Sequence, residues 1–211
     1  MNDDRIAELL SPFIQQGPLS RGQLSAVQSY LEMLLKWNSK INLTAIRNSD
    51  EIVTRHFGES LFAASRIFPN QNSTASVIDI GSGAGFPGLP IRIWAAGISL
   101  TLIESNQRKA TFLREVVRAL NLPQIEVVMD RAENLSIQAE VVTLRAVERF
   151  ERALPIVPRL LRPNGQAALL IGSAQVEVAK AALPLHWQEP IPIPLSRSRV
   201  LLLGRAQSGE F

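Results

Sequence analysis

The chain contains no cysteine and only two histidines, His56 and His186. Without cysteine it can form neither a disulfide, nor a thiolate nucleophile, nor a cysteine metal site. The two histidines lie far apart and show no metal-ligand spacing, so we expect no metal. The first residues lack the basic and apolar regions of a signal peptide, and no apolar run approaches the length that spans a bilayer. These absences favour a cytoplasmic protein with no membrane partner.

The chain also carries little excess charge of either sign. The 211 residues include 22 Lys and Arg against 19 Asp and Glu, for a formal net charge of +3. Apolar residues make up 46% and charged residues 19%, which is typical of an ordinary globular chain. Basic residues outnumber acidic ones towards the C-terminus, where Arg197 and Arg199 stand close together. An anionic partner is compatible with this distribution.

Glycine, by contrast, is concentrated in one place. The short apolar run 77–80 contains a single acid, Asp79, and leads directly into Gly81, Gly83, Gly85 and Gly88. Glycine adopts positive φ and has no Cβ, so a loop of this kind lets the backbone approach a ligand closely. A strand that ends in such a loop and continues into a helix is typical of a nucleotide-type cofactor site in an α/β sheet.

The hydrophobic pattern changes along the chain. Residues 1–70 predict a helical region, with a capping box from Ser20 to Gln23 and a third helix over 49–67. After a polar linker, residues 76–211 predict alternating strands and helices, and therefore a mainly parallel sheet whose last strand is antiparallel. We expect strands over 77–80, 99–104, 125–129, 140–144, 166–171 and 200–204, and helices over 89–96, 107–120, 150–161 and 175–183. Pro155 and Pro158 should kink or shorten the third of these helices, and Pro190, Pro192 and Pro194 restrict their stretch to an edge or a loop.

The choice of cofactor depends on the ends of these strands, where ligands bind in this class of sheet. Glu104 ends the second strand, where a carboxylate would accept hydrogen bonds from the ribose hydroxyls of an adenosine. Nicotinamide dinucleotides and S-adenosylmethionine both carry that ribose. The segment 83–88 formally matches the dinucleotide pattern, but Pro87 removes one N–H that a pyrophosphate would use. The residues therefore favour S-adenosylmethionine, with a nicotinamide-dependent oxidoreductase as the alternative.

Several blocks of the sequence resemble the glucose-inhibited division protein B family, the bacterial methyltransferases that modify a guanine N7 in 16S ribosomal RNA. The blocks are Leu35–Thr44, Arg55–Ser60, Asp79–Pro90, Leu102–Ser105, Arg108–Lys109, Phe112–Leu113, Arg131–Glu133 and Arg145–Ala146. The resemblance covers roughly residues 20–172. It implies a Rossmann-like class I S-adenosylmethionine-dependent methyltransferase fold, with 16S ribosomal RNA or the small-subunit ribonucleoprotein as the partner. Methylation of another RNA, and a non-catalytic RNA-binding role, remain alternatives.

The candidate cofactor-binding residues come from the loop and from the family motifs. They are Asp79, Gly81, Gly83, Gly85, Phe86, Glu104, Ala132, Glu133 and Arg145. Two of them have equally ordinary explanations: Asp79 as a structural cap and Glu133 as a helix N-terminal acid. Arg145 is expected to face the methyl group, with a surface salt bridge as the less favoured alternative.

Guanine N7 carries a lone pair and no proton, so methylation needs in-line alignment and no general base. We therefore predict no catalytic acid or base. The candidate RNA contacts are His56, Arg108, Lys109, Arg197 and Arg199. A packing role is the more usual one for a histidine such as His56, and each cation alone is more often a solvated charge. The sequence departs from the family at Glu59 and Glu104, where aspartate is usual, and at Ile171, where lysine is common.

Overall fold

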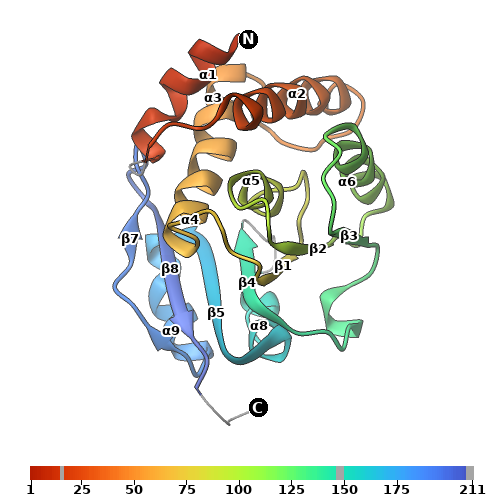
Figure 1. Ribbon diagram of the computed structural model, residues 1–211. Coiled ribbons are helices and arrows are strands. Elements are labelled where there is room, and N and C mark those ends of the chain that lie inside the picture. The colour runs from red at the N-terminus through yellow and green to blue at the C-terminus, as the bar shows by residue number, and fades with distance from the viewer. Residues whose placement is uncertain (15–16, 146–149, 208–211) are drawn as a thin grey trace.

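The structure is a computed structural model that describes residues 1–14, 17–145 and 150–207. Its N-terminal part consists of helices (Figure 1): α1 (Asp3–Leu10), α2 (Arg21–Asn38), α3 (Ser49–Ile52) and α4 (Glu59–Ile67). The predicted capping box is confirmed at the start of α2, where the Ser20 hydroxyl accepts from the Gln23 N–H. The helix predicted over 49–67 is continuous, but its middle, Val53–Gly58, is π-helical and joins α3 to α4.

The predicted strands form one mixed sheet. Its strands are β1 (Ser76–Ile80), β2 (Ser99–Ile103), β3 (Ile125–Val128), β4 (Ala139–Arg145), β5 (Leu161–Gly172), β6 (His186–Trp187), β7 (Ile191–Pro192) and β8 (Arg199–Arg205). The order is β3-β2-β1-β4-β5-β8-β6, with β7 also paired to β8. The strands β1 to β5 are parallel, and β8 runs antiparallel to β5. The predicted α/β fold, mainly parallel with its last long strand antiparallel, is therefore confirmed.

The helices that follow the strands lie close to their predicted positions. They are α5 (Gly88–Trp94), α6 (Gln107–Ala119), α7 (Phe150–Ala153), α8 (Ile156–Leu160) and α9 (Val176–Ala182). The single helix predicted over 150–161 is two short helices, because Pro155 interrupts it and caps α8. The two-residue strands β6 and β7 were not predicted, since a pair of residues is too short to show alternation. Pro192 does lie in an edge strand.

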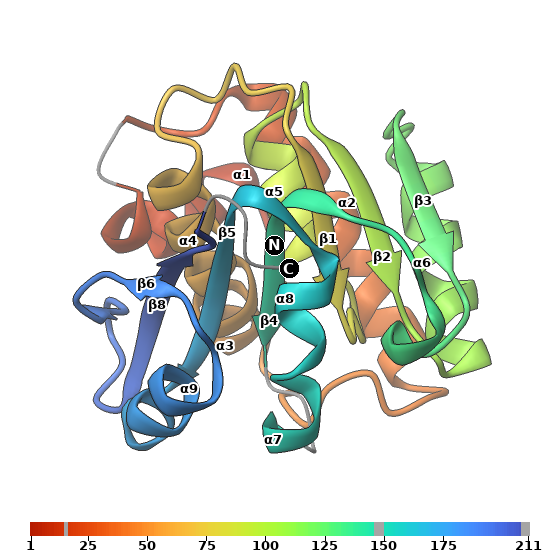
Figure 2. The same cartoon turned by 90° about the horizontal axis from the view of Figure 1, so that it is seen from below.

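Helices cover both faces of the sheet (Figure 2). On one face α7, α8 and α9 lie over the strands, and apolar side chains such as Val142, Val157 and Leu202 form a core there. On the other face α5 packs against β1 and β2 and α6 packs against β3, while α2 lies against α5 and α6. Tyr30 and Leu102 belong to the core on this face. The N-terminal helices therefore share a core with the sheet. The division into a helical region over 1–70 and a domain over 76–211 stays a prediction.

None of the described helices is both long enough and apolar enough to span a membrane.

Candidate functional site

The glycine loop begins where β1 ends. Gly81, Gly83 and Gly85 have φ angles of +64°, +57° and +92°, a left-handed region that favours glycine. At Gly85 a Cβ would also collide with the Tyr30 hydroxyl and approach the Leu89 side chain to 2.6 Å. The same Tyr30 hydroxyl, from α2, donates a hydrogen bond to a loop carbonyl, that of Ala84. A residue of the N-terminal helices thus fixes the conformation of this loop.

Asp79 lies beneath the loop and is fully buried. Its Oδ1 accepts from the Thr143 hydroxyl at 2.7 Å, and its Oδ2 accepts from the Gly88 N–H at 3.3 Å. Burial raises the pKa of Asp79 to about 6, although these hydrogen bonds to the carboxylate act in the opposite direction. The Asp79 side chain links β1 to β4 and to the first residue of α5.

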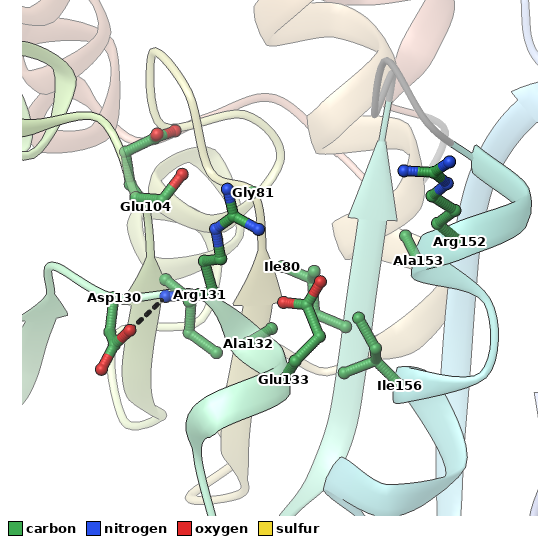
Figure 3. A pocket seen from close by; sticks show the side chains of 12 residues that line it. Ile80, Gly81, Glu104, Asp130, Arg131, Ala132, Glu133, Arg152, Ala153 and Ile156 are labelled. Carbon is green, nitrogen blue, oxygen red and sulfur yellow. Dashed lines mark hydrogen bonds between the residues drawn. The ribbon is translucent and has the colours of Figure 1, made fainter.

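A cavity of about 400 Å³ opens at the carboxyl ends of β1, β2 and β3 (Figure 3). Its floor contains apolar side chains, and charged groups lie around its rim. The lining residues are Ile80, Gly81, Ile103, Glu104, Ser105, Asp130, Arg131, Ala132, Glu133, Arg152, Ala153 and Ile156. Of the predicted cofactor-binding residues, the cavity brings together Gly81, Glu104, Ala132 and Glu133.

Glu104 connects this cavity to the glycine loop. Its carboxylate, from a residue only 7% exposed, accepts from the Gly83 N–H at 2.8 Å and from the Asn106 N–H at 2.7 Å. An ionised carboxylate offers about four lone-pair sites, so these two bonds leave capacity for two more donors. The arrangement fits a pair of ribose hydroxyls.

The opposite rim of the cavity is a single 3-10 turn after β3, Ala132–Asn134. Asp130 holds this turn: its Oδ1 accepts from the Arg131 N–H at 2.6 Å and from the Asn134 amide at 2.8 Å. These two bonds lower the pKa of Asp130. Ala132 is buried and Glu133 is exposed at the rim. The turn therefore presents both backbone and a carboxylate to the cavity.

Sequence reasoning missed Arg152, Ala153 and Ile156, which complete the cavity from α7 and α8. These residues follow the fourth predicted strand, so the rule that ligands bind at carboxyl strand ends could have included them.

The remaining predicted cofactor residues lie outside the cavity lining. Asp79, Gly83 and Gly85 shape the loop. Phe86 is buried against it, and Arg145 points towards the N-terminal helices.

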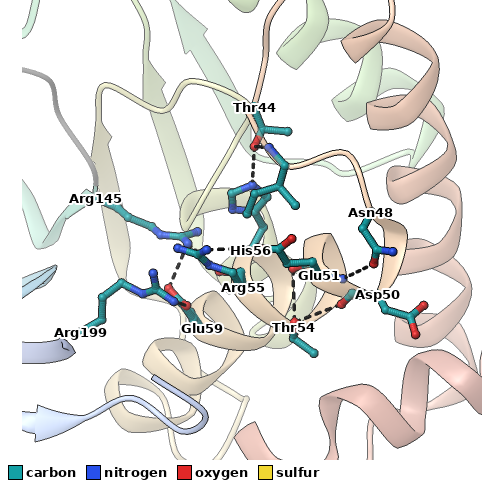
Figure 4. A network of polar contacts seen from close by, with 11 residues as sticks. Thr44, Asn48, Asp50, Glu51, Thr54, Arg55, His56, Glu59, Arg145 and Arg199 are labelled. Atoms are coloured by element: carbon teal, nitrogen blue, oxygen red, sulfur yellow. Dashed lines mark hydrogen bonds and ion pairs between the residues drawn. The ribbon is translucent and has the colours of Figure 1, made fainter. Parts of the chain in front are cut away.

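Arg145 belongs to a buried charge cluster with Glu59 and Arg199 (Figure 4). Glu59, which is 1% exposed, pairs with Arg145 at 3.0 Å through one oxygen and with Arg199 through the other. The Arg145 guanidinium also donates to the Arg55 carbonyl in the π-helical segment at 2.6 Å. The cluster joins α4 to the ends of β4 and β8. Glu59 was noticed in the sequence only as a departure from the family.

His56 lies beside this cluster. Its Nε2 is 2.7 Å from the Thr44 hydroxyl, and its ring stacks on Phe86 with centroids 4.9 Å apart. Phe86 stacks in turn on Tyr30 at 5.3 Å. Burial, together with the charges of Arg145, Arg55 and Arg199, lowers the pKa of His56 to about 3, so its imidazole is neutral at pH 7.

Three buried nitrogen atoms in this region have no hydrogen-bond partner among the described residues: His56 Nδ1, Arg145 Nη1 and Arg199 Nε. Buried polar groups are usually paired, so these atoms mark a place where a polar ligand could complete the site.

The other predicted RNA contacts lie in two places. Arg108 and Lys109 occupy the first turn of α6, whereas Arg197 is exposed in the segment before β8, near Arg55. No group of three or more His, Cys, Asp and Glu side chains within the described ranges could hold a metal ion.

The fold resembles solved methyltransferase structures. A ribosomal protein L11 methylase from Lactobacillus delbrueckii subsp. bulgaricus has a TM-score of 0.61 and 16% identity, covering 72% of this chain and 80% of that one. A SAM-dependent methyltransferase from Aquifex aeolicus has a TM-score of 0.57 and 13% identity, covering 69% and 90%. At these identities the likeness shows the fold alone.

Sequence comparison is more specific. A family model described as rRNA small subunit methyltransferase G (GidB) matches residues 23–186. The protein named ribosomal RNA small subunit methyltransferase G in Chloroflexus aggregans is 38% identical over 206 residues, covering 88% of this chain and 83% of the relative. The protein of that name in Stenotrophomonas maltophilia (strain K279a) is 37% identical over 202 residues, covering 93% and 92%. The predicted resemblance is thereby confirmed, and the chain belongs to the ribosomal RNA small subunit methyltransferase G family.

Proposed function

We propose that this protein transfers a methyl group from S-adenosylmethionine to N7 of a guanine in 16S small-subunit ribosomal RNA. The observation that carries the proposal is the position of Glu104, at the mouth of a 400 Å³ cavity and hydrogen-bonded to the glycine loop, in a chain of this family. The names of the relatives support small-subunit ribosomal RNA as the substrate. The cofactor supplies the methyl group, on a sulfonium sulfur that makes it electrophilic.

Different cavity residues bind different parts of this cofactor. Glu104 accepts from the two ribose hydroxyls, and Ala132 and Glu133 recognise the adenine edge with a backbone N–H and a carboxylate. Gly81 allows close backbone approach at the methionine end. Asp79, Gly83, Gly85 and Phe86 maintain the loop conformation that makes this approach possible.

Arg145 acts as a positioning residue. Glu59 and the Arg55 carbonyl hold its guanidinium next to His56, and its Nη1 has no partner among the described residues and is proposed to bind a ligand.

The site has to orient the guanine base and the methyl donor relative to each other. N7 of guanine needs no deprotonation, so the residues that contact the base need only align it and exclude water. A neutral His56 suits this task, because the purine becomes cationic on methylation and a protonated imidazole would repel it. We expect Arg108, Lys109 and Arg197 to contact RNA phosphates. Arg199, the fourth candidate, is already paired with Glu59 and would have to contact RNA while keeping that pair. We assign this reaction to the cytoplasm, where bacterial ribosomal RNA is modified.

The structure gives the oxidoreductase alternative little support. Tyr30, the only tyrosine, is fully buried and donates its hydroxyl to the Ala84 carbonyl, so it is not available as a proton donor to a substrate.

The proposal is tested by incubating the protein with methyl-labelled S-adenosylmethionine and small-subunit RNA from cells that lack this modification. We expect label on a single guanine at N7, and none with RNA that is already modified. Parallel reactions with naked RNA, ribonucleoprotein and assembled subunits identify the form that is methylated. Label on protein or on small molecules alone would refute the proposal, and label on a different RNA would support the alternative substrate.

A further inference from the structure

A second hollow, of about 340 Å³, lies between the segment that follows α2 and the first turn of α6. It is lined by Asn38, Ser39, Lys40, Ile41, Asn42, Arg47, Asn106, Arg108 and Lys109. We call it the basic hollow. Two of its residues, Arg108 and Lys109, were predicted to contact RNA, whereas Lys40 and Arg47 were not.

The charge of the basic hollow is one-sided. Four of its nine lining residues are cationic, and no lining residue is acidic. None of Lys40, Arg47, Arg108 and Lys109 forms an ion pair within the part of the chain that the structure describes, whereas Arg5, Arg55, Arg118, Arg145 and Arg199 all do. Four unpaired cations on one concave surface repel one another unless an anion enters. The basic hollow is therefore suited to a ligand with several negative charges.

One wall of the basic hollow is held in place by a buried side chain. Asn38, which is 5% exposed, accepts hydrogen bonds from the N–H groups of Leu43 at 2.9 Å and Thr44 at 3.0 Å. Thr44 in turn accepts from the Ile46 N–H at 3.1 Å and contacts His56. These bonds fold the segment 39–47 into a fixed shape, with Lys40 near its start and Arg47 at its end.

The other wall of the basic hollow is the start of α6, and there the side chains, not the backbone N–H groups, are available to bind an anion. At the start of α6 the Asn106 side chain already accepts from the N–H groups of Arg108 at 3.0 Å and Lys109 at 3.2 Å. The helix terminus is thus satisfied by its own cap. An anion in the basic hollow would be bound by the side chains of the four cations.

The basic hollow adjoins the cofactor cavity. Asn106 lines the hollow, Ser105 lines the cavity, and Glu104 accepts from the Asn106 N–H. A polyanion bound in the hollow would therefore pass beside the cavity. We propose that the basic hollow binds backbone phosphates of the substrate RNA, with Lys40 and Arg47 contributing as much as Arg108 and Lys109. This inference rests on the proposed function, because that function supplies the RNA.

The test is the salt dependence of RNA binding, measured without cofactor, for Lys40→Gln, Arg47→Gln and the double variant. Removing one phosphate-binding cation should make the slope of log K against log salt shallower by about 0.7–0.9, which is about five- to eightfold weaker binding at 0.1 M salt. The melting temperature and the affinity for S-adenosylmethionine should not change. All three variants alter only exposed residues and leave Asn38 intact, and if the double variant does not fold, the single variants carry the test.

Arg21→Gln is the matched control. Arg21 is also exposed and forms no ion pair among the described residues, but it lies at the opposite end of α2, about 25 Å away along the helix. It should leave the slope unchanged. Equal slopes for the wild type and the double variant, or an equal change in Arg21→Gln, would overturn the inference. So would weaker binding of free inorganic phosphate in the variants with no change in RNA binding.

The two proposals fail separately. If the protein methylates RNA but its Lys40 and Arg47 variants bind RNA with an unchanged salt slope, only the proposal for the basic hollow is refuted. A protein that shows the expected slopes and transfers no methyl group refutes only the proposed reaction.

Discussion

Among single residues, Glu104 has the most direct role in the candidate cofactor site. Glu104→Ala removes the proposed ribose acceptor and also leaves the Gly83 and Asn106 N–H groups without their partner. Hydrogen bonds to a charged group contribute about 1.5–3 kcal/mol, so the dissociation constant for S-adenosylmethionine should rise about 10- to 100-fold in calorimetric titration. Glu126→Ala, an exposed glutamate of β3, is the control and should bind normally. Normal binding of S-adenosylmethionine by Glu104→Ala would show that Glu104 does not bind the cofactor.

Glu59 balances two arginines at once. Glu59→Gln leaves Arg145 and Arg199 close together without their shared counter-charge, and breaking a buried pair in this way costs about 3–5 kcal/mol. The free energy of unfolding in urea should fall by about 3 kcal/mol, at the lower end of that range, since Arg199 is partly exposed. Glu51→Gln breaks the exposed pair with Arg55 and should cost under about 1 kcal/mol. Equal costs in the two variants would show that the buried cluster is not stabilising.

Asp79 should make stability depend on pH. Its pKa is about 6 in the folded protein against an ordinary 3.8, so the folded state holds the proton more tightly than the unfolded state does. Its contribution to stability is complete below about pH 4 and is lost as the pH rises through about 6. Asp79→Asn keeps an acceptor for Gly88 and offers a donor to Thr143, but it does not titrate.

The free energy of unfolding of Asp79→Asn, relative to the wild type, should therefore increase by about 2 kcal/mol between pH 4 and pH 7. Urea titrations at several pH values measure this difference. His56, whose pKa is lowered, titrates with the opposite sign, but it is present in both proteins and cancels. A difference that does not vary with pH would mean that the pKa of Asp79 is not raised.

At the scale of elements, the π-helical segment packs tightly against a 3-10 turn that follows α1, Ser11–Phe13. A Cβ at Gly58 would lie 2.6 Å from the Phe13 ring, which is 1% exposed and cannot easily move. Gly58→Ala should therefore destabilise the protein by about 1–3 kcal/mol in thermal or urea unfolding. Gly22→Ala, at an open position of α2, should instead stabilise it by about 0.5 kcal/mol. A neutral Gly58→Ala would show that α4 shifts freely against this turn.

The elements that the sequence predicted well are those with a local signal. The β1 strand with its glycine loop, the capping box at Ser20 and the break at Pro155 all depend on neighbouring residues, and all are confirmed. The π-helical segment was not predicted, because its side-chain spacing over six residues differs little from that of an α-helix.

The buried charge cluster lay beyond prediction for a different reason. Glu59 is 86 positions from Arg145 and 140 from Arg199, and nothing local to any of them indicates the pairing. The same holds for Tyr30, whose hydroxyl reaches the glycine loop 54 positions away. The only sign of this contact in the sequence was the Tyr30 hydroxyl itself, a single polar atom among the apolar residues of the predicted helix.

At the scale of the whole molecule, the N-terminal helices and the sheet should unfold together. Tyr30 and Leu34 of α2 share a core with Leu102 of β2 and Leu113 of α6. Native-state hydrogen exchange should therefore give the amides of α2 and β1 opening free energies within about 1 kcal/mol of each other. Markedly faster exchange throughout α2 would instead support an independent helical region over 1–70.

The strand order also has a consequence for synthesis. The central strand β1 pairs with β2 on one side and β4 on the other, so the middle of the sheet is complete only when Arg145 has been made. The helix α2 ends at Asn38, roughly a hundred residues earlier, and at about 5–20 residues per second its apolar face waits about 5–20 s for a covering surface. During each round of translation Val27, Tyr30 and Leu34 are exposed to the cell's chaperones before the helices α5 and α6 are packed on the finished sheet and bury them.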